Sequence, residues 1–406
     1  MRRVWQAALA LLKPRRKDLE HGLALHAESL VWDAYGFAPG CAPDARAVNA
    51  AIRAGASNSE LQDLVESTGM GRWLSDARER DEYLRAWEVS GVHCIYQNAG
   101  EECQAPLRIL KRLARFTHVM DMAPTVISRA ARPDDVAGAP KRGVRHLYLT
   151  TNGIPLAQEW NNVVEEMRFI RLFFQLGVRM MHLTYNRRNM IGDGCGESSN
   201  AGLSDFGRTV IAEMNRVGVL VDVAHSGART CIEAAQVSRK PVVASHSVCR
   251  ALNPRCCRGK PDPVLRALAG SGGYTGICMV PPFLGRSHDL LAMLDHVDHA
   301  VRKVGADHVA IGTDWPWLSS AWKREHARIR GPRMRTRWAN FWPPGDPYSR
   351  EKGWENTMER RGLAWTNWPL ITVGLVQRGH SDAAIRKIIG GNVLRVARAV
   401  FPKPVL

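Results

Sequence analysis

Short apolar runs rich in β-branched residues alternate with longer segments of helical periodicity along most of the chain. Runs of this length are typical of buried strands, and the longer segments suit the helices that connect parallel strands. The clearest predicted strands are residues 143–150, 178–184, 217–223, 241–245, 273–279 and 308–312. Helices are predicted between them at residues 161–175, 204–216, 228–237 and 290–304. The pattern therefore predicts an α/β fold with a parallel sheet covered by helices.

Two earlier runs, residues 30–33 and 92–97, bring the predicted strands to the eight that a closed barrel needs. A (β/α)8 TIM-like barrel is therefore the predicted architecture, and an open doubly wound sheet is the alternative. We expect residues 29–402 to form this single barrel domain and residues 1–28 to form an N-terminal helical extension. Residues 315–368, rich in Trp, Arg and Pro, are expected to be an insertion after the last clear strand.

Composition agrees with one large globular unit, because 45% of the 406 residues are hydrophobic and 23% are charged. The net charge of +17 would suit an anionic partner. Much of the excess lies in residues 2–17 and 323–337, however, which is typical of solvated surface, so we expect no nucleic-acid partner. Nine cysteines without a dense framework favour a reducing compartment, and a cytoplasmic location is expected. The apolar run 4–12 is too short for a membrane span, which needs about 20 residues.

Candidate ligands for a metal ion follow three predicted strands. His225 comes after strand 217–223, His246 after strand 241–245 and Asp314 after strand 308–312. The carboxyl ends of barrel strands meet at one rim, where such barrels build their active sites. Imidazole and carboxylate groups are ordinary zinc ligands, and a carboxylate can instead accept a proton from water. The sequence therefore predicts a metal site of His225, His246 and Asp314.

Five segments resemble the membrane dipeptidase family, that is, the renal dipeptidase-like peptidase family M19, in its bacterial branch. They are FFQLGVRMMHLTYNRRN, GLSDFGRTVIAEMNRVGVLVDVAHSG, PVVASHSVCRAL, HVAIGTDW and RGHSDAAIRKIIGGNVLRV. The resemblance runs from about residue 30 to residue 400. It implies a distorted TIM barrel of the metal-dependent hydrolase type and a two-metal centre that hydrolyses dipeptides, including those with a D-residue on the carboxyl side. It also implies a homodimer.

The resemblance assigns roles to four residues of this sequence. His225 and His246 match the two family histidines that hold one metal, and Asp314 matches the conserved metal-binding acid. Arg258 matches the arginine that binds the substrate carboxylate, a task that suits the two-pronged guanidinium group.

The departures from the family fall on the other metal. Tyr35 and Phe37 stand where the family has His-x-Asp, and neither is a normal zinc ligand. Thr151, with Asn152 beside it, stands at the bridging glutamate. Tyr185 replaces a family histidine and is placed to bind substrate and to donate to the oxyanion of the reaction. Two close cations need a bridging carboxylate, so we expect one zinc ion rather than two.

Three functions remain open from the sequence. The first is a metallohydrolase that cleaves a dipeptide-like amide with one metal, Asp314 acting as a ligand or as the general base. The second is a catalytically impaired barrel that serves as a binding or scaffold protein, and the third is an enzyme with altered chemistry on a peptide-derived metabolite. Retention of the metal-binding residues favours the first. Tyr35 is expected to fill the vacated metal position with its hydroxyl on Asp314, and His182 is expected to be a structural histidine of the barrel.

Overall fold

The computed structural model describes residues 1–100, 105–157, 162–331, 341–350 and 353–402. Residue 161 of the predicted helix 161–175, and residues 332–340 and 351–352 of the expected insertion, lie outside the described residues.

Eight parallel strands form the path of the sheet, in the order β1-β2-β4-β5-β6-β7-β9-β10. These strands are β1 (Trp32–Gly36), β2 (Cys94–Asn98), β4 (Arg145–Thr151), β5 (Val178–His182), β6 (Leu220–Asp222), β7 (Val242–Cys249), β9 (Thr275–Ile277) and β10 (Val309–Ile311). Two short strands lie off this path: β3 (Ile127–Arg129) pairs with β4, and β8 (Gly259–Lys260) pairs with β7.

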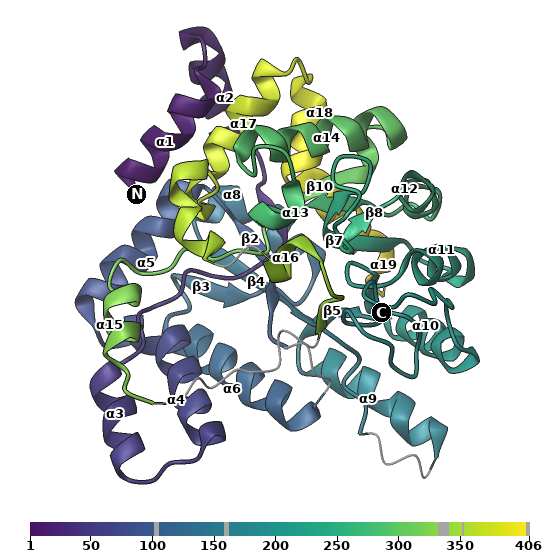
Figure 1. The fold of residues 1–406 in the computed structure, drawn as a ribbon, viewed down its shortest axis with the longest axis horizontal. Coiled ribbons are helices and arrows are strands. Elements are labelled where there is room, and N and C mark those ends of the chain that lie inside the picture. Colours follow the sequence, from purple (N-terminus) through teal and green to yellow (C-terminus); the bar gives the residue numbers. More distant parts are fainter. Residues whose placement is uncertain (101–104, 158–161, 332–340, 351–352, 403–406) are drawn as a thin grey trace.

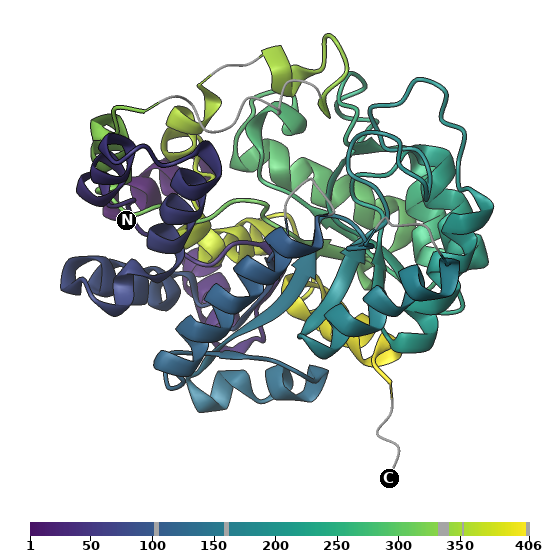
Figure 2. The same ribbon diagram turned by 90° about the horizontal axis from the view of Figure 1, so that it is seen from below.

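Helices surround the strands on all sides in Figures 1 and 2. The longer helices are α1 (Arg2–Leu12), α2 (Arg16–Glu28), α3 (Ala45–Arg53), α4 (Asn58–Gly71), α5 (Ala77–Ser90), α6 (Pro106–Met122), α9 (Val163–Gln175), α10 (Asp205–Val217), α11 (Ala228–Val237), α12 (Asp262–Gly270), α14 (Leu290–Val304), α17 (Trp368–Gln377) and α19 (Asn392–Val400). Shorter ones are α7 (Pro133–Ala137), α8 (Ala139–Arg142), α13 (Pro281–Leu284), α15 (Trp322–Arg328), α16 (Pro347–Arg350) and α18 (Asp382–Arg386).

The first and last strands of the path meet at a seam, so the barrel is nearly closed. Past the end of β10, the backbone N–H of Asp314 donates to the carbonyl of Tyr35 at 3.0 Å. Below this bond, buried Asp33 accepts from the backbone N–H of Thr313 at 2.9 Å and from its hydroxyl at 2.5 Å. These bonds replace a regular strand ladder, and the (β/α)8 barrel prediction is confirmed while the open sheet is wrong.

Alternation along the strands divides the core into two layers, as a barrel requires. Inward side chains form one buried cluster that includes Trp32, Tyr96, Tyr148, Met180 and Tyr274. Outward side chains pack against the helices in a second and larger cluster. Strand β7 runs four residues past the predicted end at residue 245, since Val248 and Cys249 pair with β8.

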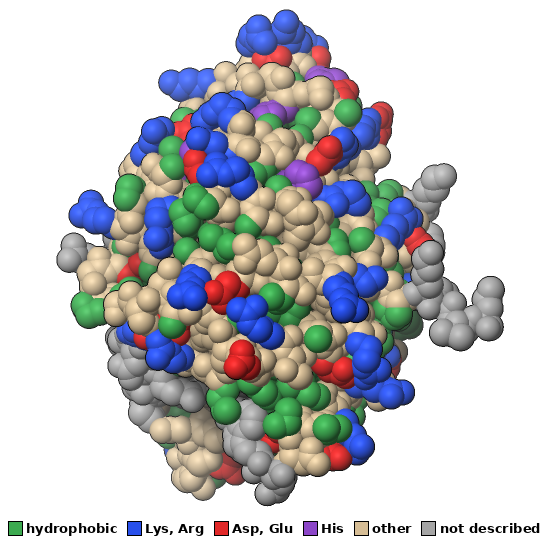
Figure 3. Space-filling view, turned by 90° about the vertical axis from the view of Figure 1, so that its right-hand side faces the viewer, with side chains coloured by type: hydrophobic (Ala, Val, Ile, Leu, Met, Phe, Trp, Pro, Cys, Tyr) green, Lys and Arg blue, Asp and Glu red, His purple; other side chains and the backbone are tan. Residues whose placement is uncertain are grey.

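The N-terminal helices pack on the barrel. Helix α2 lies against α17 (Figure 1), so closely that a Cβ on Gly22 would lie 2.7 Å from the Cα of Val373. On the face shown in Figure 3, Lys and Arg side chains are spread among Asp and Glu rather than gathered in one patch. Among the described helices, none is both long and apolar enough to cross a bilayer.

Candidate metal centre and substrate pocket

Three neighbouring strands each place one histidine at the rim formed by the carboxyl ends of the barrel strands. His182 is the last residue of β5, His225 follows β6, and His246 lies within β7. All three are buried, and one ring nitrogen of each lies within 4.8 Å of the others. Among the described residues, this is the group that has the spacing to hold a metal ion.

His225 and His246 face each other through their Nε2 atoms, which are 3.0 Å apart. The Nδ1 of His225 donates to the side-chain oxygen of Asn186 at 2.7 Å, so the Nε2 of the neutral ring carries a lone pair. The Nδ1 of His246 is hydrogen-bonded to the Ser245 hydroxyl at 2.8 Å. Burial, together with the charge of Arg258, holds the pKa of both imidazoles well below the usual value. Both rings are therefore neutral, which is the form that binds metal ions.

His182 is the member of this group that sequence reasoning assigned to structure alone. Its Nδ1 donates to the carbonyl of Thr151 at 2.8 Å, as expected for a structural histidine. Its Nε2 lies 2.8 Å from a carboxylate oxygen of Asp222. One of its ring nitrogens also lies within 4.8 Å of the other two histidines. The signal that marks it is its place at the end of the strand next to the one that precedes His225.

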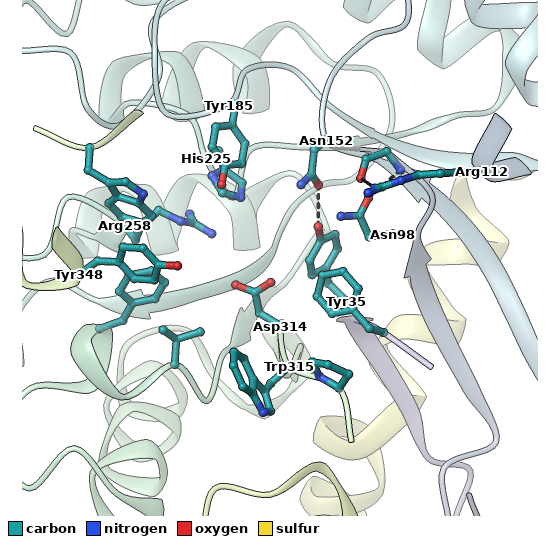
Figure 4. A pocket seen from close by; sticks show the side chains of 16 residues that line it. Tyr35, Asn98, Arg112, Asn152, Tyr185, His225, Arg258, Asp314, Trp315 and Tyr348 are labelled. Atoms are coloured by element: carbon teal, nitrogen blue, oxygen red, sulfur yellow. Dashed lines mark hydrogen bonds between the residues drawn. The ribbon is translucent and has the colours of Figure 1, made fainter. Parts of the chain in front are cut away.

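A cavity of about 290 Å³ opens above the histidines at the rim. Figure 4 shows His225 and Asp314 near its centre, with Arg258 on one side and Tyr35, Asn152 and Asn98 on the other. Its lining residues are Tyr35, Phe37, Asn98, Gly100, Arg112, Asn152, Tyr185, His225, Arg258, Val280, Phe283, Asp314, Trp315, Pro316, Trp342 and Tyr348. The walls are largely aromatic, and a few polar groups converge between them, as is usual for small-molecule sites.

Arg258 is fully buried at one side of this cavity. Its guanidinium donates to the carbonyl of Ala224 and, at 2.9 Å, to that of His246. Within the described part of the chain its Nε–H has no hydrogen-bond partner. A cation anchored from behind with donors to spare can bind an anionic group in the cavity.

Asp314 lines the cavity beside His225, but it does not belong to the group of three histidines. Its backbone is in the left-handed region, with φ of 55°, a conformation that non-glycine residues adopt mainly at functional sites and turns. Burial raises the pKa of its carboxyl to about 7, although the charges of Arg258 and His182 act in the opposite direction. Its assignment as a metal ligand stays a prediction.

The positions where the resemblance places the other metal hold an aromatic and amide cluster. The ring of Tyr35 is stacked on His246 with centroids 3.8 Å apart, and Phe37 meets the edge of Tyr35 at 6.0 Å. The Tyr35 hydroxyl donates to the side-chain oxygen of Asn152 at 2.6 Å, so the bond to Asp314 expected from the sequence is wrong. Thr151 is buried and donates to the carbonyl of Gly153 at 2.7 Å. None of these four side chains is a carboxylate.

Tyr185 covers the ring of His225. Its ring is stacked on His225, with centroids 4.1 Å apart, and Phe341 meets its edge at 5.3 Å. Tyr185 also lines the cavity. Each ring of the histidine pair is thus covered by an aromatic ring, His246 by Tyr35 and His225 by Tyr185.

Comparison with known families adds a match over more than half of the chain. Residues 82–323 match the family described as membrane dipeptidase (peptidase family M19). Among curated proteins, dipeptidase verJ of Clonostachys rogersoniana is 30% identical over 234 residues, which is 57% of this chain and 50% of the relative. Dipeptidase tcpJ of Claviceps purpurea is 29% identical over 236 residues, 57% of this chain and 47% of the relative. The matched region spans about half the length of these curated relatives.

Solved structures support the fold over nearly the whole chain. An amidohydrolase from Pseudomonas aeruginosa is similar with a TM-score of 0.66 and 22% identity, covering 94% of this chain and 99% of that one. The probable dipeptidase PvdM from the same organism gives a TM-score of 0.64 at 19% identity, covering 95% and 99%. At these identities the likeness establishes the barrel fold.

Proposed function

The chain belongs to the membrane dipeptidase family, peptidase family M19, and from this premise we propose that it is a metallohydrolase that cleaves a dipeptide or dipeptide-like amide with one zinc ion. The observation that carries the proposal is the convergence of three buried histidine nitrogens beneath a cavity that also holds Arg258 and Asp314. A scaffold protein has no physical need of this combination.

The donor set fits a metal ion on chemical grounds. The Nε2 atoms of His225 and His246 are 3.0 Å apart, less than twice the zinc–nitrogen distance of about 2.0–2.1 Å, so one ion can contact both. The Ser245 hydroxyl can donate or accept, so His246 can carry its proton on Nδ1 and leave Nε2 free. A metal ion bound here supplies polarisation of the scissile carbonyl and a lowered pKa for a water molecule.

A third ligand completes an ordinary catalytic zinc site, and the chain offers two candidates. One ring nitrogen of His182 lies within 4.8 Å of the pair. Its Nδ1–H is already fixed on the Thr151 carbonyl, as is common for histidine ligands, so the candidate ligand atom is Nε2, which would have to exchange its contact with Asp222 at 2.8 Å for the metal ion. Asp314, the ligand that the resemblance implies, lines the cavity above. We favour His182 as the third ligand and Asp314 as the group that handles protons.

Asp314 is suited to transfer protons at neutral pH. Because burial raises the pKa of its carboxyl to about 7, both protonation states are accessible there. The carboxylate accepts a proton from the attacking water, and the acid returns it to the leaving amine. Tyr185, beside His225, is proposed to donate to the developing oxyanion.

Arg258 is proposed to hold the carboxylate at the carboxyl end of the substrate. Its fixed guanidinium binds that group without reorganisation, because Ala224 and His246 already set its position. The scissile bond then lies toward His225 and Asp314, which occupy the middle of the cavity (Figure 4).

The test is hydrolysis of a dipeptide panel by the full chain after zinc loading and removal of unbound metal. We expect turnover that a chelator abolishes and zinc restores, and a loss of at least about 100-fold in kcat/KM for His225→Ala and for Asp314→Asn. His21→Ala is the matched control, because His21 is exposed and pairs with Asp382 at the surface. Zinc-loaded protein without turnover on any dipeptide would favour the scaffold function instead.

A further inference from the structure

A second cavity, of about 230 Å³, adjoins the one above the histidines. The two share Phe37, Asn98, Arg112 and Pro316 as lining residues, so the second begins where the first ends. It extends between the outer face of the barrel and helices α4 and α6, and its remaining lining residues are Ala38, Pro39, Gly40, Glu66, Gly69, Met70, Tyr83, Gln97, Phe116, Val119, Ile127, Leu147 and Leu318.

The inner walls of this second cavity are apolar. Phe116 and Val119 of α6 and Leu147 of β4 line it, and each is more than nine-tenths buried. A dry cavity of about 150 Å³ with such walls is large enough to bind benzene, so this one can take an aromatic ring or a medium-length alkyl chain. Its size and lining suit an apolar group rather than a polar one.

The charged groups at its mouth are paired with one another. Arg112 donates to both carboxylate oxygens of Glu66, at 3.0 and 2.8 Å, and to the carbonyl of Gly100 at 2.8 Å. Arg108 and Arg115 also meet Glu66, at 3.0 and 2.9 Å. Although burial alone would raise it, these arginines lower the pKa of the Glu66 carboxyl to about 2. The salt-bridged cluster is thus a rigid rim of the mouth.

The order of Arg258, the histidines and the two cavities determines which end of a bound dipeptide points toward the second cavity. Arg258 lies on one side of His225 and Asp314, and Asn98 and Arg112 lie on the other (Figure 4). A dipeptide whose carboxylate is held by Arg258 therefore has its amino-terminal residue directed toward the shared mouth. This direction rests on the proposed function.

From this arrangement we propose that the second cavity binds a large apolar side chain on the amino-terminal residue of the substrate. The preferred substrate class is then a dipeptide-like amide with an aromatic or long alkyl group on that residue. Each buried methylene adds roughly a factor of four in affinity, so a six-carbon side chain gains at least about 30-fold over glycine at the same position even if only about half of its carbons are buried.

Gly69→Leu fills the cavity with little risk to the fold. Gly69 lies in α4 and lines the second cavity but not the first. A Cβ on Gly69 would meet only the carbonyl oxygen of Cys41, at 3.9 Å. Leucine also has the better helix propensity. Gly270→Leu is the matched control, since Gly270 ends α12, is exposed, and its Cβ would meet nothing within 4 Å. Met70→Trp is a second filling variant from the same helix.

The experiment compares two dipeptides that differ only in the amino-terminal residue, glycine or 2-aminooctanoic acid. The readouts are the ratio of their kcat/KM values and, by calorimetry, the ratio of Kd values for their non-hydrolysable reduced-amide analogues. We expect ratios of at least about 30 for the wild type and Gly270→Leu, and below about 3 for Gly69→Leu and Met70→Trp. A wild-type ratio near one, no binding of either analogue, or a preference that survives both filling variants would overturn the proposal. If the analogues bind with the expected Kd ratios but neither dipeptide is hydrolysed, the cavity assignment stands and the proposed function is rejected.

Discussion

The phenol ring of Tyr35 lies flat on the imidazole of His246, with ring planes 18° apart and centroids separated by 3.8 Å. Tyr35 stands at a position that the resemblance assigns to a ligand of the other metal. The aromatic ring places carbon atoms, which cannot bind a metal ion, against the imidazole. The Tyr35 hydroxyl is already hydrogen-bonded to Asn152. The contact supports the proposed site with one ion.

The metal content of the protein follows from this arrangement. We expect about one equivalent of zinc per chain after loading and desalting, measured by elemental analysis, because Tyr35, Phe37 and Thr151 provide no carboxylate to bridge a second cation. His246→Ala is expected to reduce the content to near zero. Two tightly bound equivalents in the wild type would contradict the one-metal site.

The identity of the third ligand is a separate prediction. We expect His182→Asn to weaken zinc binding by about 10- to 100-fold or more in a competition with a chromophoric chelator, and Asp314→Asn to have a smaller effect. Because the His182 change leaves the buried carboxylate of Asp222 without its neighbour, the double variant with Asp222→Asn is measured beside it. The reverse order of effects would restore Asp314 as the ligand.

The hydroxyl of Tyr35 is expected to contribute to stability rather than to metal binding. Tyr35→Phe keeps the stack on His246 but leaves the buried oxygen of Asn152 without its donor, which costs about 1–3 kcal/mol in the free energy of unfolding. Urea denaturation measures this difference. Tyr274→Phe is the control, since in the described structure the buried Tyr274 hydroxyl has no partner, and its removal should be neutral or stabilising. Equal losses in the two variants would refute the role of the Asn152 bond.

The barrel was predictable because each of its strands and helices leaves a pattern in its own short stretch of sequence. Buried parallel strands appear as short apolar runs, and the helices between them keep their own periodicity: α11 and α14 begin and end at the predicted residues, 228–237 and 290–304. Strand lengths were harder to predict, because the end of β7 depends on a two-residue strand 10 residues later, β8, which has no apolar pattern of its own.

The site was predictable only where strand ends carry the chemistry. The proximity of His225 and His246 follows from that rule, whereas the proximity of His182 to them depends on which way its ring turns at the end of β5. The partner of the Tyr35 hydroxyl depends on side-chain geometry across the barrel, so sequence reasoning chose Asp314 and the structure has Asn152. The second cavity arises from how α4 and α6 pack on the sheet. The pattern of hydrophobic residues along the chain does not predict where packed elements leave a cavity.

Asp33 at the barrel seam makes the stability of the fold depend on pH. Burial raises the pKa of its carboxyl to about 7, although bonds from Thr313, from the Trp365 indole at 3.2 Å and from the Tyr35 backbone act in the opposite direction. Between the unfolded pKa of about 3.9 and the folded value, the native chain therefore holds a proton that the unfolded chain has lost. The contribution of Asp33 to stability is consequently largest below about pH 4, falls as pH rises to about 7, and is constant above it. Asp33→Asn removes this titration.

We therefore expect the free energy of unfolding of Asp33→Asn, relative to the wild type, to rise by at most about 4 kcal/mol between pH 4 and pH 7, at about 1.4 kcal/mol per unit. Above pH 7 the difference should be flat. The measurement is urea denaturation at one-unit pH intervals, with Asp121→Asn, an exposed position at the end of α6, as the control that should show little change. The asparagine amide has one acceptor oxygen fewer than the carboxylate for the donors at the seam, so the variant loses the same amount of stability at every pH. Only the change of the difference with pH therefore tests whether Asp33 is protonated in the folded chain. A difference that is independent of pH, or that shifts in favour of the wild type as pH rises, would mean that Asp33 is ionised throughout and stabilises the seam as a carboxylate.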